Sequence, residues 1–231
     1  MSNELLWIIF MIADLSMVLV MYKIFGKAGL YAVVVMSSII CNIQVVKLVK
    51  LFGMTATLGN IIYASNFFAT DILSEYYGKR DAKRAVWLGF SMLIVATAWM
   101  QLALLFKPSP EDFSQEHLKA IFSLLPRITF ASLTAYILAQ MHDVWAFHFW
   151  KKKTRGKHLW LRNNASTMVS QLIDSVIFTT IAFLGVVDSK TFWSILITTY
   201  IFKFIVAVFD TPFMYLTRII KPSDRSSLVD S

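Results

Sequence analysis

The chain has 231 residues, of which 57% are hydrophobic and 16% are charged, and its mean hydropathy is +0.62. A soluble domain of this size needs far more polar surface, so the composition indicates an integral membrane protein. The formal charge of +8 is typical of basic cytoplasmic loops in such a protein, and we therefore expect no nucleic-acid partner.

Apolar runs near the bilayer-spanning length of about 20 residues recur along the chain. They predict an all-α polytopic membrane bundle with seven spans. In chain order these spans are Leu5–Tyr22, Leu30–Phe52, Ala56–Glu75, Ala85–Phe106, Arg127–Trp150, Ala165–Val187 and Thr191–Arg218. Between the fourth and the fifth, Ser109-Pro110-Glu111-Asp112 is a helix-start signal that predicts a short helix lying on the membrane surface.

Basic residues are distributed unevenly between the two sets of loops. Loops after the first, third and fifth spans, with the C-terminal tail, hold Lys23, Lys27, Lys79, Arg80, Lys83, Arg84, Lys151, Lys152, Lys153, Arg155, Lys157, Arg162, Arg218, Lys221 and Arg225. The opposite loops hold Lys47, Lys50, Lys107, Lys119, Arg127 and Lys190. Because positive charge concentrates in cytoplasmic loops, we expect the N-terminus outside and the C-terminus in the cytoplasm.

Ionisable side chains also occur deep inside the predicted spans. They are Asp14, Asp71, Asp143, Asp174, Lys203 and Asp210. Each would cost roughly 2.5–3.5 kcal/mol near the centre of a lipid-facing helix, so most should face an internal cavity or one another. The simpler interpretation is mutual pairing, for example of Lys203 with Asp174 or Asp210, and Asp14 is expected to be structural.

The polar residues form stripes at helical spacing, which predicts that several helices present polar faces to one cavity. The stripes are Ser38 and Asn42; Asn66 with Thr70, and Asp71 with Glu75; Ser132, Tyr136, Gln140 and Asp143; Asn164, Thr167, Gln171, Asp174 and Ser175; and Tyr200, Lys203 and Asp210. Asn60, Gln101 and His148 stand alone, and no role is assigned to them.

Three of these stretches resemble the queuosine precursor transporter family, formerly called vitamin uptake transporters. They are Phe68-Ala69-Thr70-Asp71-Ile72-Leu73-Ser74-Glu75-Tyr76-Tyr77-Gly78, Ala131 to Asp143, and Asn164-Ala165-Ser166-Thr167 to Asp174, and Tyr200 to Tyr215 is similar to the last helix of the family. The resemblance covers about Leu30 to Tyr215. It implies one integral membrane domain, 1–231, made of an extra N-terminal helix (1–25), a six-helix core (30–217) and a cytoplasmic tail (218–231).

The resemblance also implies a function, which is import of 7-deazaguanine precursors of the tRNA base queuosine across the cell membrane. The substrates would be bases such as 7-cyano-7-deazaguanine or its aminomethyl relative. The residues expected to bind the substrate are Asn66, Thr70, Asp71, Tyr136, Gln140, Asp143, Asn164, Gln171, Asp174 and Lys203, with Phe178 as a further stacking surface. Coupling to a proton or an ion is expected of Asp71, Asp143, Asp174 or Asp210. No catalytic residue, cofactor or metal is expected, and the only partners are the substrate, the bilayer and, as an open alternative, a second copy of the chain.

Three other functions stay open at this point. The chain could be the vitamin-binding membrane subunit of an ATPase-driven importer, because the family resembles such subunits. An intramembrane enzyme could use His142, Asp143 and His148, but no H-E-x-x-H pair or serine nucleophile motif accompanies them. A structural or receptor-like bundle would not explain so many aligned acids.

Overall fold

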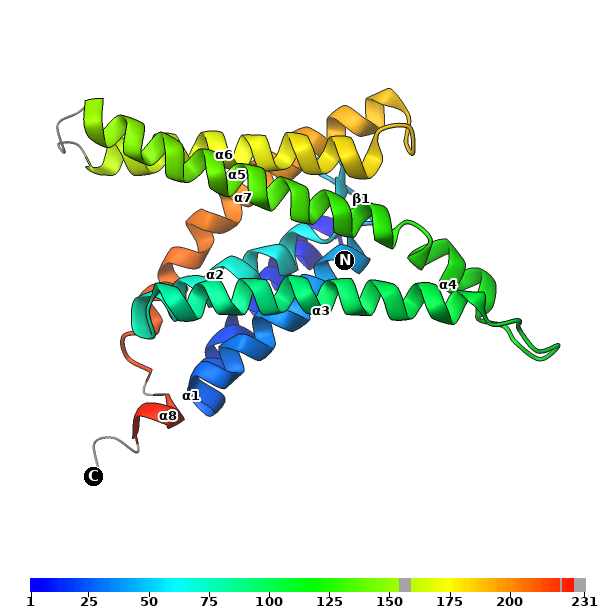
Figure 1. The fold of residues 1–231 in the computed structure, drawn as a ribbon, viewed down its shortest axis with the longest axis horizontal. Helices are drawn as coiled ribbons and strands as arrows, with labels where there is room; N and C mark the ends of the chain where they lie inside the picture. Colours follow the sequence, from blue (N-terminus) through cyan, green and yellow to red (C-terminus); the bar gives the residue numbers. More distant parts are fainter. Residues whose placement is uncertain (154–158, 221, 227–231) are drawn as a thin grey trace.

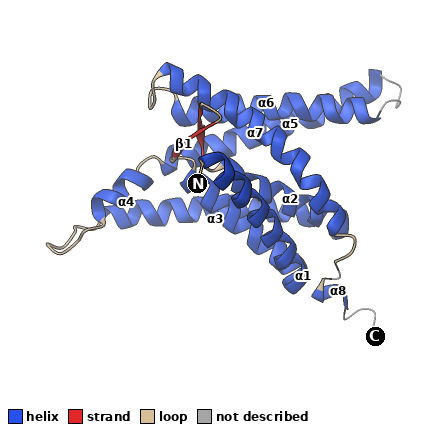
Figure 2. Ribbon diagram, turned by 180° about the vertical axis from the view of Figure 1, so that it is seen from behind, coloured by secondary structure: helices blue, strands red, loops and turns tan. Residues whose placement is uncertain are grey.

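The computed structural model describes residues 1–153, 159–220 and 222–226. Its elements run in the order α1 (Asn3–Gln44), β1 (Leu48–Leu51), β2 (Met54–Thr57), α2 (Asn60–Tyr76), α3 (Lys79–Leu105), α4 (Gln115–Phe122), α5 (Leu125–Lys153), α6 (Leu159–Phe183), α7 (Ser189–Leu216) and α8 (Ser223–Ser226). Figure 1 shows α5 and α6 side by side, with α7 running from this pair towards α2. Seen from behind, in Figure 2, α1, α2 and α3 lie together below that pair.

The helix α1 consists of two arms, 3–25 and 27–44, that turn back on each other at Gly26. Gly26 has a φ of 53° and a ψ of −131°, a conformation that only glycine adopts readily. A straight helix of 42 residues would be about 63 Å long. Instead, the side-chain amide of Asn3 donates to the Lys50 carbonyl at 3.1 Å, just beyond the far end of the helix. The first two predicted spans therefore correspond to the two arms of one helical hairpin.

The prediction that Leu30–Phe52 is helical to its end was wrong. The helix ends at Gln44, and a two-stranded antiparallel sheet follows, with Leu51 opposite Met54. Phe52 and Gly53 connect the strands with φ angles of 50° and 77°, which is the two-residue turn that matches the twist of a β-hairpin. The all-α prediction therefore needs this correction, and α2 begins at Asn60 rather than at Ala56.

The short helix predicted between the fourth and fifth spans is present as α4, but it begins later than the sequence signal suggested. It starts at Gln115, because the Asp112 carboxylate accepts hydrogen bonds from the backbone N–H groups of Ser114 (3.2 Å) and Gln115 (3.0 Å). A carboxylate in this position satisfies donors that the first turn of a helix leaves free. Its position on the membrane surface stays a prediction.

Within the described residues, three stretches are long and apolar enough to cross a bilayer. They are Asn3–Gln44, Lys79–Leu105 and Gln115–Ala139, and Met168–Phe183 is a shorter apolar helix. The molecule is thus a predominantly helical, membrane-type protein, whereas the number of seven spans stays a prediction.

Two sets of contacts define the two ends of the bundle. At one end the backbone N–H of Phe52 donates to the Glu4 carboxylate at 3.1 Å. At the other end Asp224 of α8 accepts hydrogen bonds from the backbone N–H of Lys27 and the hydroxyl of Tyr77, both at 2.9 Å. Lys27 also forms an ion pair with Asp81 at 3.0 Å. This second end holds several of the basic residues expected in the cytoplasm, and the side of the membrane that it faces stays a prediction.

Candidate functional site

A cavity lies between the second arm of α1 and the helices α2, α3, α5, α6 and α7. The space between these elements measures about 790 Å³, including the part that opens to the outside. It is lined by Ser38, Cys41, Asn42, Val45, Gly59, Asn60, Tyr63, Asn66, Phe67, Thr70, Val86, Phe90, Ser132, Tyr136, Asp174, Phe178, Thr199 and Lys203. The prediction that polar faces of several helices converge on one cavity is confirmed.

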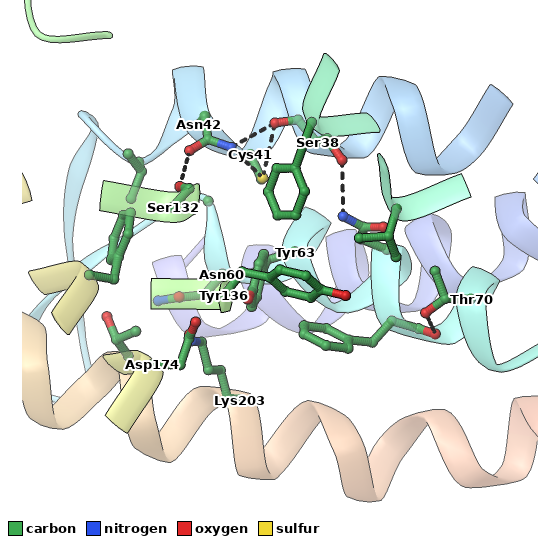
Figure 3. A pocket seen from close by; sticks show the side chains of 18 residues that line it. Ser38, Cys41, Asn42, Asn60, Tyr63, Thr70, Ser132, Tyr136, Asp174 and Lys203 are labelled. Carbon is green, nitrogen blue, oxygen red and sulfur yellow. Dashed lines mark hydrogen bonds and ion pairs between the residues drawn. The ribbon is translucent and has the colours of Figure 1, made fainter. Parts of the chain in front are cut away.

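The charged part of the cavity wall is an ion pair between Lys203 of α7 and Asp174 of α6. The Asp174 side chain is 7% exposed and that of Lys203 is 9% exposed. The Lys203 ammonium also lies 4.7 Å from the centre of the Tyr63 ring, within the range of a cation–π interaction. Figure 3 shows Asp174 and Lys203 together on one side of the cavity, with Tyr63 and Tyr136 above them. The wall therefore presents a negative and a positive group side by side, each compensated by the other.

A network of amides and hydroxyls forms the part of the wall around the second arm of α1. Ser132 of α5 donates to the Asn42 side-chain oxygen at 2.5 Å, and the Asn42 amide donates to the Ser38 carbonyl at 2.7 Å. The Asn66 amide of α2 donates to the Ser38 hydroxyl at 3.1 Å. These hydrogen bonds (dashed in Figure 3) fix the relative positions of α1, α2 and α5. Since its nitrogen is engaged, the Asn66 amide can offer its oxygen as an acceptor.

Aromatic side chains supply the flat surfaces of the cavity. Those on its lining are Tyr63, Phe67, Phe90, Tyr136 and Phe178. The Tyr136 and Phe90 rings pack at 4.9 Å between centres and 59° between planes. A planar heterocycle gains both apolar burial and ring–ring contact in such surroundings. The cavity is therefore suited to a flat solute that has a polar edge.

One further polar atom on the wall is buried and has no hydrogen-bond partner among the described residues. It is the hydroxyl of Thr199 on α7, one turn before Lys203. A buried hydroxyl without a partner costs free energy unless a bound molecule or water satisfies it. Thr199 thus adds a donor–acceptor group next to the ion pair.

The structure brings together about half of the residues that the sequence predicted for the site. Asn66, Thr70, Tyr136, Asp174 and Lys203 all line the cavity, together with the stripe residues Ser38, Asn42 and Ser132 and the proposed stacking residue Phe178. The pairing of Lys203 with Asp174, considered as the simpler interpretation, is also present.

The remaining predicted residues either do not line the cavity or have side chains outside the described residues. Asp71 is exposed on α2, and neither it nor Asp210 nor Gln171 lines the cavity. The role of Asp71 and Asp210 in coupling stays a prediction. The side chains of Gln140, Asp143 and Asn164 lie outside the described residues.

Several lining residues were missed by the sequence analysis, among them Asn60, which had been assigned no role. On α2, Asn60, Tyr63, Phe67 and Thr70 follow one another at intervals of three or four residues, so they share one face of the helix. This signal was present in the sequence, but Tyr63 and Phe67 had been counted as part of an apolar run. Thr199 lies four residues before Lys203 and could have been found in the same way.

Among the described residues, no group of three or more His, Cys, Asp or Glu side chains is arranged to hold a metal ion. The wall offers instead hydrogen-bonding groups and aromatic rings.

Comparison with known proteins agrees with this geometry. The family described as "Putative vitamin uptake transporter" matches residues 57–217. A protein of Bacillus subtilis (strain 168) named "Probable queuosine precursor transporter" is 45% identical over 228 residues, which cover 98% of this chain and 100% of that protein. The chain belongs to the queuosine precursor transporter family. It is therefore a multi-pass protein of the cell membrane.

More distant members of the family are also similar. The "Queuosine precursor transporter" of Escherichia coli (strain K12) is 28% identical over 193 residues, covering 81% of this chain and 82% of that protein. A protein of Haemophilus influenzae with the name "Probable queuosine precursor transporter" is 27% identical over 162 residues, covering 68% of this chain and 66% of its own length. No solved structure matches the chain. The resemblance seen in the sequence is thus confirmed at the level of the family.

Proposed function

We propose that this protein imports 7-deazaguanine precursors of queuosine, such as 7-cyano-7-deazaguanine or its aminomethyl relative, and binds them in the cavity of Figure 3. The names of the related proteins support the solute class. The observation that carries the proposal is the adjacent acceptor and donor, Asp174 and Lys203, on the wall of a cavity with aromatic sides.

The polar edge of a deazaguanine base matches this pair. The edge presents two neighbouring N–H donors and, next to them, a carbonyl acceptor. A carboxylate accepts two parallel hydrogen bonds, and an ammonium donates to a carbonyl oxygen. Asp174 would therefore bind the N–H groups and Lys203 the carbonyl, while the flat ring packs against Tyr136 or Phe178.

The ion pair also explains how two charged side chains can be stable within the membrane. An uncompensated charge at this depth would cost several kcal/mol. Since Asp174 and Lys203 neutralise each other, release of the solute would leave no bare charge. A solute that offers both donors and an acceptor can replace part of this pairing at little cost.

The proposal is tested with purified protein reconstituted alone into liposomes. Uptake of labelled 7-cyano-7-deazaguanine is measured for the wild type, Asp174→Asn and Lys203→Met. We expect uptake by the wild type and at least about a tenfold loss in each variant, since each removes one charge-assisted hydrogen bond worth roughly 1.5–3 kcal/mol. Ser91→Ala on the exposed face of α3 is the matched control and should retain full uptake.

Competition by related bases tests the recognition of the polar edge. A deazapurine without the exocyclic amine should compete poorly, whereas 7-deazaguanine should compete well. Equal competition by both bases, or full uptake by Asp174→Asn, would refute the site. If the purified protein binds the base but transports it only with an ATPase module, the chain is instead the binding subunit of an ATPase-driven importer.

A further inference from the structure

Thr199 of α7 presents a buried hydroxyl at the cavity wall that the binding of the base described above does not use. The residue lines the cavity and is 2% exposed. Its Oγ1 atom has no hydrogen-bond partner among the described residues. Because a buried hydroxyl without a partner costs free energy, this group is available to a bound molecule.

The backbone of α7 does not satisfy this hydroxyl in the usual way. A buried hydroxyl inside a helix can donate to the carbonyl four residues earlier, as Thr97 does to Leu93 at 2.8 Å. For Thr199 that carbonyl belongs to Ile195, and it accepts a hydrogen bond from the neighbouring hydroxyl of Thr198 at 3.1 Å. The two adjacent threonines of α7 therefore differ, since among the described residues only the first has a partner for its hydroxyl.

Thr199 is also distinguished by its position beside the ion pair. The hydroxyls of Ser175 and Thr179 on α6 are buried without a partner among the described residues too, but neither residue lines the cavity. Thr199 lies four residues before Lys203, and both line the cavity, so the two side chains share one face of α7 about 6 Å apart along its axis. The wall therefore offers an ammonium and a hydroxyl in a row along α7.

The chemistry of the proposed solute has the same order of groups. In a 7-substituted deazaguanine the carbonyl lies between the N–H donors on one side and the substituent at position 7 on the other. The carbonyl and this substituent point in nearly the same direction. With the N–H groups at Asp174 and the carbonyl at Lys203, the substituent falls beside the carbonyl, where α7 places Thr199. A hydroxyl donates to a nitrile nitrogen and accepts from an aminomethyl group, so it suits either precursor.

We propose that Thr199 is a specificity-determining residue whose hydroxyl binds the substituent at position 7 of the solute, an inference that rests on the proposed function. A base without this substituent still binds Asp174 and Lys203 but leaves the Thr199 hydroxyl unpaired. Guanine has the same polar edge and no such substituent. The contact therefore helps the protein to select a queuosine precursor over guanine, by about three- to tenfold for one neutral hydrogen bond.

The selectivity is tested by measuring the Kd of 7-cyano-7-deazaguanine and of unsubstituted 7-deazaguanine with the purified full-length protein. Thr199→Val keeps the shape of the side chain and removes its hydroxyl. It should lower the preference for the cyano base at least about threefold while the affinity for 7-deazaguanine stays the same. Thr199→Ser keeps the hydroxyl and should keep the preference. The matched control is Thr198→Val, because the Thr198 hydroxyl already donates to the Ser194 carbonyl at 2.7 Å, and its preference should equal that of the wild type.

The contact itself is tested by infrared spectroscopy of the nitrile in the bound cyano base. A hydrogen bond donated to the nitrile nitrogen raises its stretching frequency. The frequency should be high in the wild type and in Thr198→Val, and lower in Thr199→Val. A wild-type frequency equal to that of the base in an aprotic solvent would overturn the contact, even if Thr199→Val does not fold.

The outcomes separate this inference from the proposed function. An unchanged preference in Thr199→Val, or an equal loss of affinity for both bases, would show that Thr199 does not recognise the substituent, and the importer assignment would stand. Absence of binding of either base by the wild type would refute the proposed function and this inference together.

Discussion

Lys203 and Tyr63 meet at the cavity wall, with the ammonium nitrogen 4.7 Å from the centre of the ring, while the same ammonium pairs with Asp174. The three groups come from α7, α2 and α6. A buried cation held by an acid and by an aromatic face is electrostatically satisfied without water. This is what allows these charged side chains to lie inside an apolar bundle.

The first prediction concerns the stability of this pair. Lys203→Met or Asp174→Asn alone leaves the partner charge buried and should lower the free energy of unfolding by about 3–5 kcal/mol. The double variant removes both charges and should recover most of this loss while still failing to take up solute. Unfolding in detergent, followed by circular dichroism, measures the stability.

The exposed pair of Lys27 and Asp81 is the matched comparison for this experiment. Lys27 is 42% exposed, so solvent screens the pair, and Asp81→Asn should change stability only slightly. A double variant as unstable as the worse single variant would show that the two charges do not compensate each other.

The second prediction concerns Gly89, where α3 approaches the second arm of α1. A Cβ atom added at this position would lie 2.6 Å from the Ser38 hydroxyl and 3.3 Å from a Val34 methyl. Gly89→Ala should therefore displace Ser38, break its hydrogen bond with Asn66 and cost about 1–3 kcal/mol through overpacking. Solute affinity measured by titration should fall several-fold, while Ser91→Ala on the exposed side of the same helix should retain it. Wild-type affinity in Gly89→Ala would contradict the role of Ser38 in shaping the cavity.

The third prediction separates two constraints on Gly26. Its positive φ disfavours any side chain, and an added Cβ would also lie 2.2 Å from the Asp224 carboxylate. Gly53 has a positive φ of 77° too, but nothing lies within 4 Å of the position of its Cβ. Gly53→Ala should thus cost about 1–3 kcal/mol, the usual strain of such a backbone, and Gly26→Ala should cost more.

Combining Gly26→Ala with Asp224→Ala tests the origin of the difference. Removal of the carboxylate relieves the collision, so the melting temperature should rise part of the way back towards that of the wild type. If the second substitution lowers it further, the contact of α8 with the hairpin stabilises the fold more than the collision destabilises it.

The fourth prediction concerns pH and the start of α7. The side chain and backbone N–H of Thr191 donate to Asp188 and hold the pKa of this carboxyl below its usual value. Because the folded-state pKa is lowered, the stabilisation is fully present above the ordinary aspartate pKa and is lost as the pH falls through the lowered value. Asp188→Asn keeps the helix cap but cannot titrate, so its melting temperature should decrease less between neutral and strongly acidic pH. If the melting temperatures of the wild type and Asp188→Asn fall equally towards acidic pH, the Asp188 carboxylate makes no such contribution to stability.

Much of the fold could be predicted from the sequence because lipid imposes simple rules on helices. The length of the last apolar run predicted both ends of α7 to within two residues. The spacing of the polar stripes predicted a shared cavity, and the structure places Asn66, Tyr136, Asp174 and Lys203 on its lining. The β-hairpin was missed because Leu48–Leu51 is as apolar as the helix before it. Its turn depends on the positive φ angles of Phe52 and Gly53, which hydropathy does not report.

The sequence by itself determined that this is a helical membrane protein of one family. It also determined that the acids and amides inside its helices must face away from lipid, because exposure of a polar group to lipid costs free energy whatever the arrangement of the helices. Only the tertiary structure decided which of them meet. Helical periodicity fixes the face on which a residue lies, but not the neighbour towards which that face turns. For this reason Asp71, expected in the site, is exposed, whereas Asn60, to which no role was assigned, lines the cavity.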